Sequence, residues 1–288
     1  TEPKFLMGQH FSAIAAAGPV TGPILAGIMF GWVPALIWII LGSIFIGGVH
    51  DMGSLIASVR HKARCITEVV KENVSTRAYV LFMIFIWITL VYIIVAFTDI
   101  TASSFVGKIT LENGEIVSGG AIATSSMLYL LLPVIMGLLL KFTRLNLFYA
   151  TLIFLPLVAF AIWVGQFIPF NIDQWLGISV SSAAKLWDVG ILVYCFVASI
   201  VPIWLLLQPR GHLGGYFLYS SLLIAAIGII FGGFTVKYPA FTTLTGTTSE
   251  FIFPMFPLLF ITIACGACSG FHALVSSGTT SKQLKKES

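Results

Sequence analysis

Residues Ala15–Trp32, AAAGPVTGPILAGIMFGW, decide the fold of this chain. The segment is apolar enough to enter a bilayer, yet glycine–proline pairs at 18–19 and 22–23 fall where a helix should be continuous. Each proline removes a backbone donor and crowds the carbonyl one turn earlier, while glycine tolerates unusual dihedral angles. We therefore expect unwound backbone near Gly18–Gly22 and a new helix start near Pro23.

Such an interruption has two readings. In hydrocarbon each unpaired backbone group costs several kcal/mol, so a broken helix persists only where protein or an aqueous cavity meets the freed groups. Freed carbonyls suit a cation, and a helix N-terminus suits an anion such as a carboxylate. The alternative is a simple proline kink that lets helices pack closely through the small residues 15–18. From this segment alone both readings stay open.

The composition is that of an integral membrane protein. Of the 288 residues, 58% are hydrophobic and only 9% are charged, and the mean hydropathy is +1.02, whereas soluble domains carry roughly a quarter charged residues. The apolar stretches are long enough for spanning helices and lack the alternation of an outer-membrane barrel. The net charge is +4, and the charged residues cluster at the membrane boundaries, which suggests no nucleic-acid partner.

Hydropathy predicts an all-α fold of about eight spans within a single transmembrane domain over 1–288. We place the spans at 11–29, 33–58, 78–103, 120–140, 146–168, 188–208, 216–235 and 251–276. One set of alternating ends carries 12 of the 15 lysines and arginines, and the opposite set carries only Lys108, Lys185 and Lys237. By the positive-inside rule, both chain ends should be cytoplasmic.

Two connecting segments have patterns of their own. Residues 62–76 place apolar side chains on one helical face, which predicts a short amphipathic helix lying along the inner interface. The segment around Asn113-Gly114 alternates apolar and polar residues and predicts a small β-hairpin.

Ionisable residues at membrane depth indicate where chemistry could occur, because they are costly there and usually face a cavity or a partner. His50 and Asp51 lie deep in the second span, and His272 lies near the end of the last. Asp99 and His10 lie nearer span ends. A hydroxyl cluster follows His272, namely Ser276, Ser277, Thr279 and Thr280. The alternative for each is a side chain that merely joins helices by hydrogen bonds.

The cysteine pair Cys265 and Cys268 has the C-x-x-C spacing of redox or metal sites. No second pair or suitably spaced histidine completes a zinc site, and the pair lies in an apolar segment. We expect these cysteines to be small packing residues, and we expect no metal site built on them.

Four blocks of the sequence resemble the carbon starvation protein A family: GQHFSAIAAAGPVTGPILAG, GGVHDMGSLIASVRHKARCITEVV, LLQPRGHLGGYFLY and ACGACSGFHALVSSGTTSKQL. The resemblance implies a transporter of a bacterial cytoplasmic membrane that takes up peptides or small carboxylates such as pyruvate, coupled to protons or sodium. It also implies a core of inverted repeats like that of the amino acid/polyamine/organocation transporters. Eight spans fall short of the ten of that core, so we expect a fragment whose partners include the remaining helices.

The resemblance further suggests functional residues. The sixth span would be the partner of the first in the second repeat, with Pro202 as its interruption. The expected substrate-binding residues are Gly18, Pro19, Thr21, Gly22, Pro23 and Pro202. A coupling sodium ion could lie among Gly18, Val20, Thr21, Ser277, Thr279 and Thr280, while Asp51, His50 and His272 are the candidates for proton coupling.

Two other functions remain as alternatives. A non-transporting receptor or assembly subunit would bind a ligand without gradient-driven flux. An intramembrane serine hydrolase would use Ser276 or Ser277 with His272 as base, because a spacing of four places His272 and Ser276 on one helical face. No nucleophile-elbow motif accompanies them, so we expect no enzyme, no catalytic residues and no cofactor beyond the coupling ion.

Overall fold

The computed structural model describes residues 3–15, 17–110, 116–143, 145–233, 235–247 and 252–284. Within them, eight helical stretches are long and apolar enough to cross a membrane, which confirms the predicted count and the all-α class. These stretches are Leu6–Phe30, Trp32–Arg60, Thr76–Val106, Gly119–Phe142, Leu147–Gly165, Val180–Ile200, Leu207–Phe231 and Met255–Gln283.

The sixth span corrects a prediction. Helix α10 runs over Val180–Ile200 rather than 188–208, and helix α11 runs over Leu207–Phe231. Pro202 therefore lies in the connection between two helices, and the predicted interruption within a span is wrong. The physical reason is that proline disfavours the helical conformation at the residue before it. Val201 is accordingly extended, with φ −68° and ψ 138°.

The chain divides into two compact units, Thr1–Met83 with Leu218–Ser288, and Ile84–Phe217. The first unit contains most of the residues singled out from the sequence. Its elements, besides the ends of α6 and α11, are α1 (Pro3–Ile14), α2 (Ala17–Phe30), α3 (Trp32–Leu41), the π-helix η1 (Gly42–Gly47), α4 (Gly48–Arg60), α5 (Ile66–Asn73), β3 (Thr245–Thr247), β4 (Ile252–Pro254), α12 (Met255–Ala267), α13 (Gly270–Val275), the π-helix η2 (Ser276–Thr280) and the 3₁₀ turn η3 (Ser281–Gln283).

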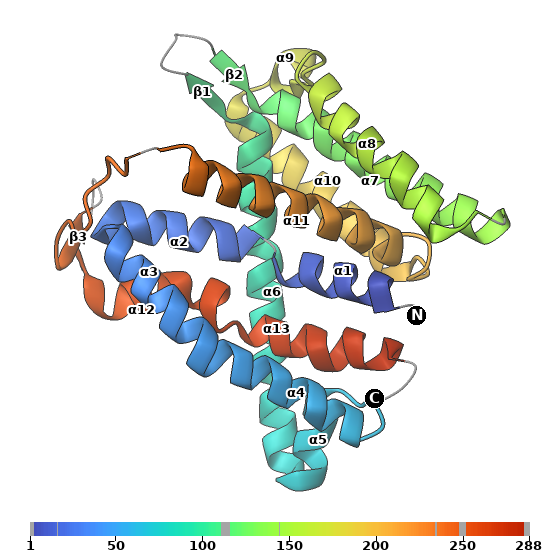
Figure 1. The fold of residues 1–288 in the computed structure, drawn as a ribbon, viewed down its shortest axis with the longest axis vertical. Helices are drawn as coiled ribbons and strands as arrows, with labels where there is room; N and C mark the ends of the chain where they lie inside the picture. Colours follow the sequence, from blue (N-terminus) through green and yellow to red (C-terminus); the bar gives the residue numbers. More distant parts are fainter. Residues whose placement is uncertain are drawn as a thin grey trace. The chain divides into compact units, whose positions relative to one another are not determined.

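Helices α2, α3 and α12 pack together in the first unit around an apolar core (Figure 1). The buried residues of this core are Ala26, Phe30, Ala35, Leu259, Ile263 and Ala267. Gly22 permits a close approach of α2 to α12, because a Cβ there would lie 2.3 Å from the carbonyl oxygen of Thr262. The chain enters α3 through Gly31, whose φ of 98° favours glycine.

The second unit consists of the larger part of α6 (Thr76–Val106), β1 (Lys108–Thr110), β2 (Ile116–Ser118), α7 (Gly119–Phe142), α8 (Leu147–Gly165), α9 (Ile172–Leu176), α10 and the first turns of α11. Helices α7 and α8 form a hairpin with an apolar core that includes Met136, Phe154 and Leu213. Beside this core the buried ring of His212 shares a 2.8 Å hydrogen bond with the Thr151 hydroxyl.

The helix and the strand pair predicted for the two patterned connections are confirmed, while the position of the helix along the inner interface stays a prediction. Residues 66–73 form α5, with Val69 buried. Arg64, just before the helix, forms an ion pair with Glu72 near its end. Strands β1 and β2 pair antiparallel as a hairpin, whose predicted turn at Asn113-Gly114 lies outside the described residues.

Candidate functional site

The interruption of the first span is present, but it lies earlier than predicted. Helix α1 ends at Ile14 and α2 begins at Ala17, so Gly18–Gly22 are helical and the expected unwinding there is wrong. Pro19 explains the shift. It has no N–H to bond the carbonyl of Ala15, and it is tolerated in the first turn of a helix. The new helix start is accordingly at Ala17 and not near Pro23.

The last span has a second interruption that the sequence analysis did not identify. Helix α12 ends at Ala267, Cys268 takes the non-helical angles φ −151° and ψ 51°, and α13 starts at Gly270. Ser269 caps the new helix by accepting a 3.2 Å hydrogen bond from the Phe271 amide. A Ser followed by Gly-Phe-His was an available cap signal, but the long apolar run around it masked the boundary.

The second span changes geometry at the same level. Its π-helix η1 joins α3 to α4, and a Cβ on Gly47 would lie 2.2 Å from the Ala267 carbonyl oxygen. A Cβ on Gly266 would in turn lie 3.2 Å from the Cα of Pro19. The π-helix of the second span thus lies against the end of α12, and α12 in turn lies against the first turn of α2. Such π segments often mark functional sites.

Beyond this level the packing becomes polar. Helix α4 runs beside α13 and η2 (Figure 1), and hydroxyl groups link them at intervals of one helical turn. The buried Ser58 hydroxyl lies 2.9 Å from that of Ser281 and 3.1 Å from the Ser277 carbonyl oxygen. Its third partner is the Arg64 carbonyl, at 2.5 Å. These bonds fix the register of α4 against the end of the last span.

Two imidazole rings contact the carboxylate of Asp51 in α4. Its Oδ2 lies 3.3 Å from Nδ1 of His272, and its Oδ1 lies 3.2 Å from Nδ1 of His50. The His272 side chain is 7% exposed, that of Asp51 24% and that of His50 45%. The group is therefore closed at His272 and open at His50.

The end of α1 is held by the same group. The ring of His272 also makes a hydrogen bond with the backbone of Ile14, the last residue of α1. One turn earlier, Nδ1 of His10 lies 2.7 Å from the Thr280 hydroxyl in η2. His10 and Ile14 share one helical face, so α1 is attached to the last span at both points.

The structure separates the residues predicted to hold sodium. Gly18, Val20 and Thr21 lie in α2, which packs mainly on α12 and α3. Ser277 and Thr280 lie in η2, which packs on α4, α13 and α1, and Thr279 lies between them. Thr280 is bonded to His10, and the Ser277 hydroxyl donates to the Ala273 carbonyl at 2.8 Å. The sodium site stays a prediction.

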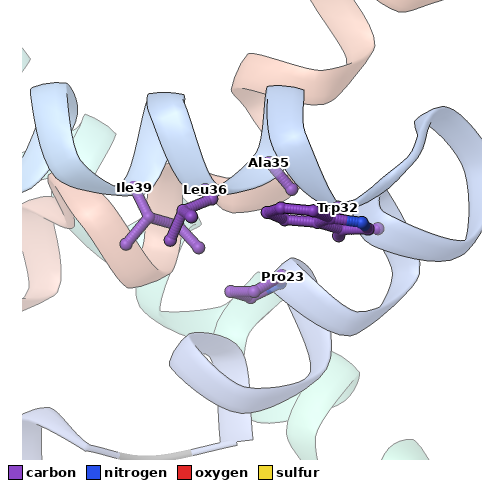
Figure 2. Close-up of a pocket in the computed structure, with 6 residues that line it drawn as sticks. Pro23, Trp32, Ala35, Leu36 and Ile39 are labelled. Carbon is purple, nitrogen blue, oxygen red and sulfur yellow. The ribbon is translucent and has the colours of Figure 1, made fainter. Parts of the chain in front are cut away.

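Pro23 lines an apolar hollow of about 220 Å³ between α2 and α3. Figure 2 shows its ring facing Trp32, with Leu36 and Ile39 farther along α3. These lining side chains offer no charge for a substrate carboxylate. Pro23 therefore has apolar neighbours in this hollow, and Pro202 belongs to the second unit.

Gln9 is a buried polar residue that sequence reasoning passed over. Its side chain is 4% exposed, and its Oε1 is one of the few buried side-chain atoms without a hydrogen-bond partner in the described part of the chain. The block GQHFSAI contains it beside His10, but nothing in that motif distinguishes a buried amide from an exposed one.

The cysteines and Asp99 are not part of the polar group around Asp51 described above. The four cysteines are free, and Cys265 lies 3.8 Å from the Ser269 hydroxyl. Among the described residues, no three His, Cys, Asp or Glu side chains are arranged to hold a metal ion. Asp99 lies near the end of α6. The hydrogen-bond partners of His272 are Asp51 and Ile14.

Comparisons with known proteins match the whole chain. The family model described as carbon starvation protein CstA matches residues 1–288. The peptide transporter CstA of Campylobacter jejuni is 34% identical over 290 residues, which is 100% of this chain and 39% of the relative. The pyruvate/proton symporter BtsT of Escherichia coli K12 is 32% identical over 289 residues, or 98% of this chain and 38% of the relative.

The chain thus spans about two fifths of the length of the curated relatives that it matches. The peptide transporter CstA of Escherichia coli K12 gives the same picture, with 33% identity over 291 residues and 39% of its length covered. No solved structure matches this chain.

Proposed function

Because this chain belongs to the carbon starvation protein CstA family, we propose that it forms the proton- and substrate-binding part of a secondary transporter. Its substrates are peptides or small carboxylates such as pyruvate. The names of its relatives support this class of activity, since they are called peptide transporters and a pyruvate/proton symporter. They do not favour a hydrolase or a receptor.

One observation carries the proposal. Asp51 and His272 form a close pair inside two membrane-spanning stretches, and His272 also bonds Ile14, the last residue of α1. Ionisable residues at such depth typically mark an ion or substrate pathway. Here the titratable pair is physically joined to an interrupted helix, so a change in its charge alters the support of α1. That is the link an alternating-access transporter needs between its ion and its moving parts.

The substrate carboxylate binds at the start of α2 in this proposal. The first amides of a helix have no partner within the helix and carry the positive end of its dipole. Pro19 has no N–H, which leaves the amides of Gly18 and Val20 with Thr21 beside them. Gly22 serves the packing on Thr262, so its role is to bring α12 close and not to touch substrate.

Protons, rather than sodium, drive transport in this proposal. The His272–Asp51 pair brings an imidazole and a carboxylate into contact, and these are groups that can carry a proton across a membrane. The Thr280 hydroxyl, which the sodium site would require, is bonded to His10. The symporter among the relatives is named for a proton.

Uptake by proteoliposomes tests the function. The purified chain is reconstituted, an inward proton gradient is imposed, and accumulation of labelled pyruvate and of labelled dialanine is followed separately. We expect at least one of them to accumulate above its equilibrium level and a protonophore to abolish the excess. Binding of either compound without any gradient-dependent accumulation would favour the receptor reading instead, and a purified protein that neither binds nor accumulates them contradicts the proposal.

A further inference from the structure

The segment that joins the second span to the third carries a dense positive charge. Residues 60–77 hold five of the 15 lysines and arginines of the chain and only two acidic residues. The basic residues are Arg60, Lys62, Arg64, Lys71 and Arg77, and all five are exposed. A topology signal of the positive-inside kind requires such charge in the loop, whatever conformation the loop adopts. Here the charge is held in a defined arrangement.

Hydrogen bonds fix the turn that follows α4. Lys62 and Ala63 both have left-handed backbone angles, with φ of 61° and 59°, a conformation that costs energy in residues other than glycine. The Ala63 amide donates to the Ser58 carbonyl at 2.8 Å. The His61 ring contacts a carbonyl of α4 at 2.7 Å and the Asn73 side chain of α5 at 3.2 Å. Backbone strain that the surroundings maintain in this way often marks a functional segment.

Helix α5 adds apolar and aromatic groups beside the charge. It packs on α4 (Figure 1) with Val69 buried, while Val74 at its end is 69% exposed. The Lys71 ammonium lies 5.3 Å from the centre of the Tyr79 ring at the start of α6. Exposed apolar and aromatic side chains next to lysine and arginine are typical of helices that lie in the membrane interface.

Most of the positive charge has no partner within the protein. Five basic residues against two acidic ones leave the segment with a net charge of +3. Glu72 is paired with Arg64. In the described part of the chain, Arg60, Lys62 and Arg77 form no ion pair. Arginine and lysine next to a spanning helix attract anionic lipids, and the guanidinium group matches the geometry of a phosphate.

We propose that residues 60–77 form a binding surface for anionic phospholipids of the cytoplasmic leaflet. Arg60, Lys62 and Arg77 contact the headgroup phosphates, and α5 lies at the boundary between headgroups and acyl chains. This surface does not depend on the proposed transport function. The opposing reading is that the charge only sets the orientation of the spans, which predicts no preference for anionic over neutral lipid.

The turn is bonded to the last span, so lipid binding there should stabilise the protein. The Ser58 hydroxyl contacts the Arg64 carbonyl within the turn and the Ser281 hydroxyl at the end of the last span. A lipid that holds the turn in its folded conformation therefore also supports the packing of α4 on that span. Because a ligand of the folded state raises the unfolding temperature, thermal unfolding reports the binding.

The test uses the purified chain in a neutral detergent. Phosphatidylglycerol or phosphatidylcholine is added to the micelles, and the midpoint of thermal unfolding is followed. We expect phosphatidylglycerol to raise the midpoint, phosphatidylcholine to leave it unchanged, and 1 M salt to remove the rise by screening the charges. An equal response to both lipids, no response to either, or the same rise with soluble glycerol 3-phosphate overturns the proposal.

Variants assign the response to the surface. In Arg60→Gln/Lys62→Gln/Arg77→Gln three unpaired charges are removed and long polar side chains are kept. Each basic residue near an anionic membrane surface strengthens the attraction about fivefold, so the triple variant should lose the response over the range in which the unmodified chain saturates. Arg60→Lys/Arg77→Lys keeps the charge and should keep the response. An unchanged response in the triple variant, or its loss in the lysine variant, overturns the proposal.

The matched control removes the same number of charges elsewhere. Lys108, Lys185 and Lys237 are exposed and lie outside residues 60–77, at the ends predicted to face away from the cytoplasm. Lys108→Gln/Lys185→Gln/Lys237→Gln should respond to phosphatidylglycerol as the unmodified chain does. An equal loss of response in this control would show that total charge, and not this surface, attracts the lipid.

Discussion

At the scale of single residues, the polar contacts of the first unit follow a simple rule. Side chains on α4 that face the last span are Asp51, Ser54 and Ser58, each separated from the next by about one turn. Two of them are serines that bond backbone or hydroxyl oxygens, and the third is the carboxylate that receives two imidazoles. Buried polar contacts of this kind favour one register of neighbouring helices.

Ser58 offers a direct test of that register. The substitution Ser58→Ala removes a fully buried hydroxyl with three oxygen partners and should lower the free energy of unfolding by about 1 kcal/mol. Thermal unfolding of the purified chain in detergent measures the change. Ser221→Ala is the control, because that exposed hydroxyl bonds the Leu218 carbonyl of its own helix. Equal effects of the two substitutions would show that the α4 contacts do not fix the register.

At the scale of helices, the sequence predicted the existence of elements better than their ends. The apolar runs gave all eight spans, and alternation gave the β1–β2 hairpin. The prolines misplaced the interruptions, because a proline disrupts the hydrogen bond of the preceding turn and is itself accepted at a helix start. Pro19 thus ends α1 several residues upstream. Pro202 ends α10 altogether, while the interruption at Cys268 needs no proline.

For the site too, the sequence predicted which residues matter better than how they are arranged. Asp51, His50 and His272 were selected because charge is costly in a membrane, and the structure brings these three together. Their link to Ile14 and the bond between His10 and Thr280 join residues more than two hundred positions apart. No local pattern contains that information, so only the packing of the first span on the last reveals it.

Gly47 tests the close contact between η1 and α12. Gly47→Ala places a Cβ 2.2 Å from the Ala267 carbonyl oxygen, and a backbone atom cannot move aside as a flexible side chain can. We expect a loss of about 1–3 kcal/mol in stability, measured as a lower midpoint of thermal unfolding. Gly53→Ala, in the next helix α4, meets no atom within 4 Å and should be neutral or slightly stabilising. A tolerated Gly47→Ala would contradict the contact.

At the scale of the whole molecule, the distribution of positive charge makes a prediction of orientation. The chain ends and the loop between α4 and α5 should face the cytoplasm. A cysteine replacing the exposed Lys62 should therefore react with a membrane-impermeant maleimide only in inside-out vesicles. A cysteine replacing the exposed Lys237 should react only in right-side-out vesicles. The reverse pattern would overturn the orientation, and labelling runs in a background without the four native cysteines.

The chain covers about two fifths of the length of its curated relatives. Within it, the first, second and last spans contribute to one polar group around Asp51. If this group couples protons to substrate, removing its charge should separate two activities that a coupled transporter performs together. Exchange of substrate across the membrane needs only the substrate site, whereas accumulation needs the proton as well.

The most direct test compares these two activities in Asp51→Asn, which keeps the shape of the side chain and removes its charge. Proteoliposomes carrying either protein are assayed for pyruvate exchange at equal concentrations on both sides and for pyruvate accumulation under an inward proton gradient. Our account predicts that the variant retains exchange and loses accumulation. A variant that accumulates pyruvate as well as the unmodified chain would contradict the central role of Asp51.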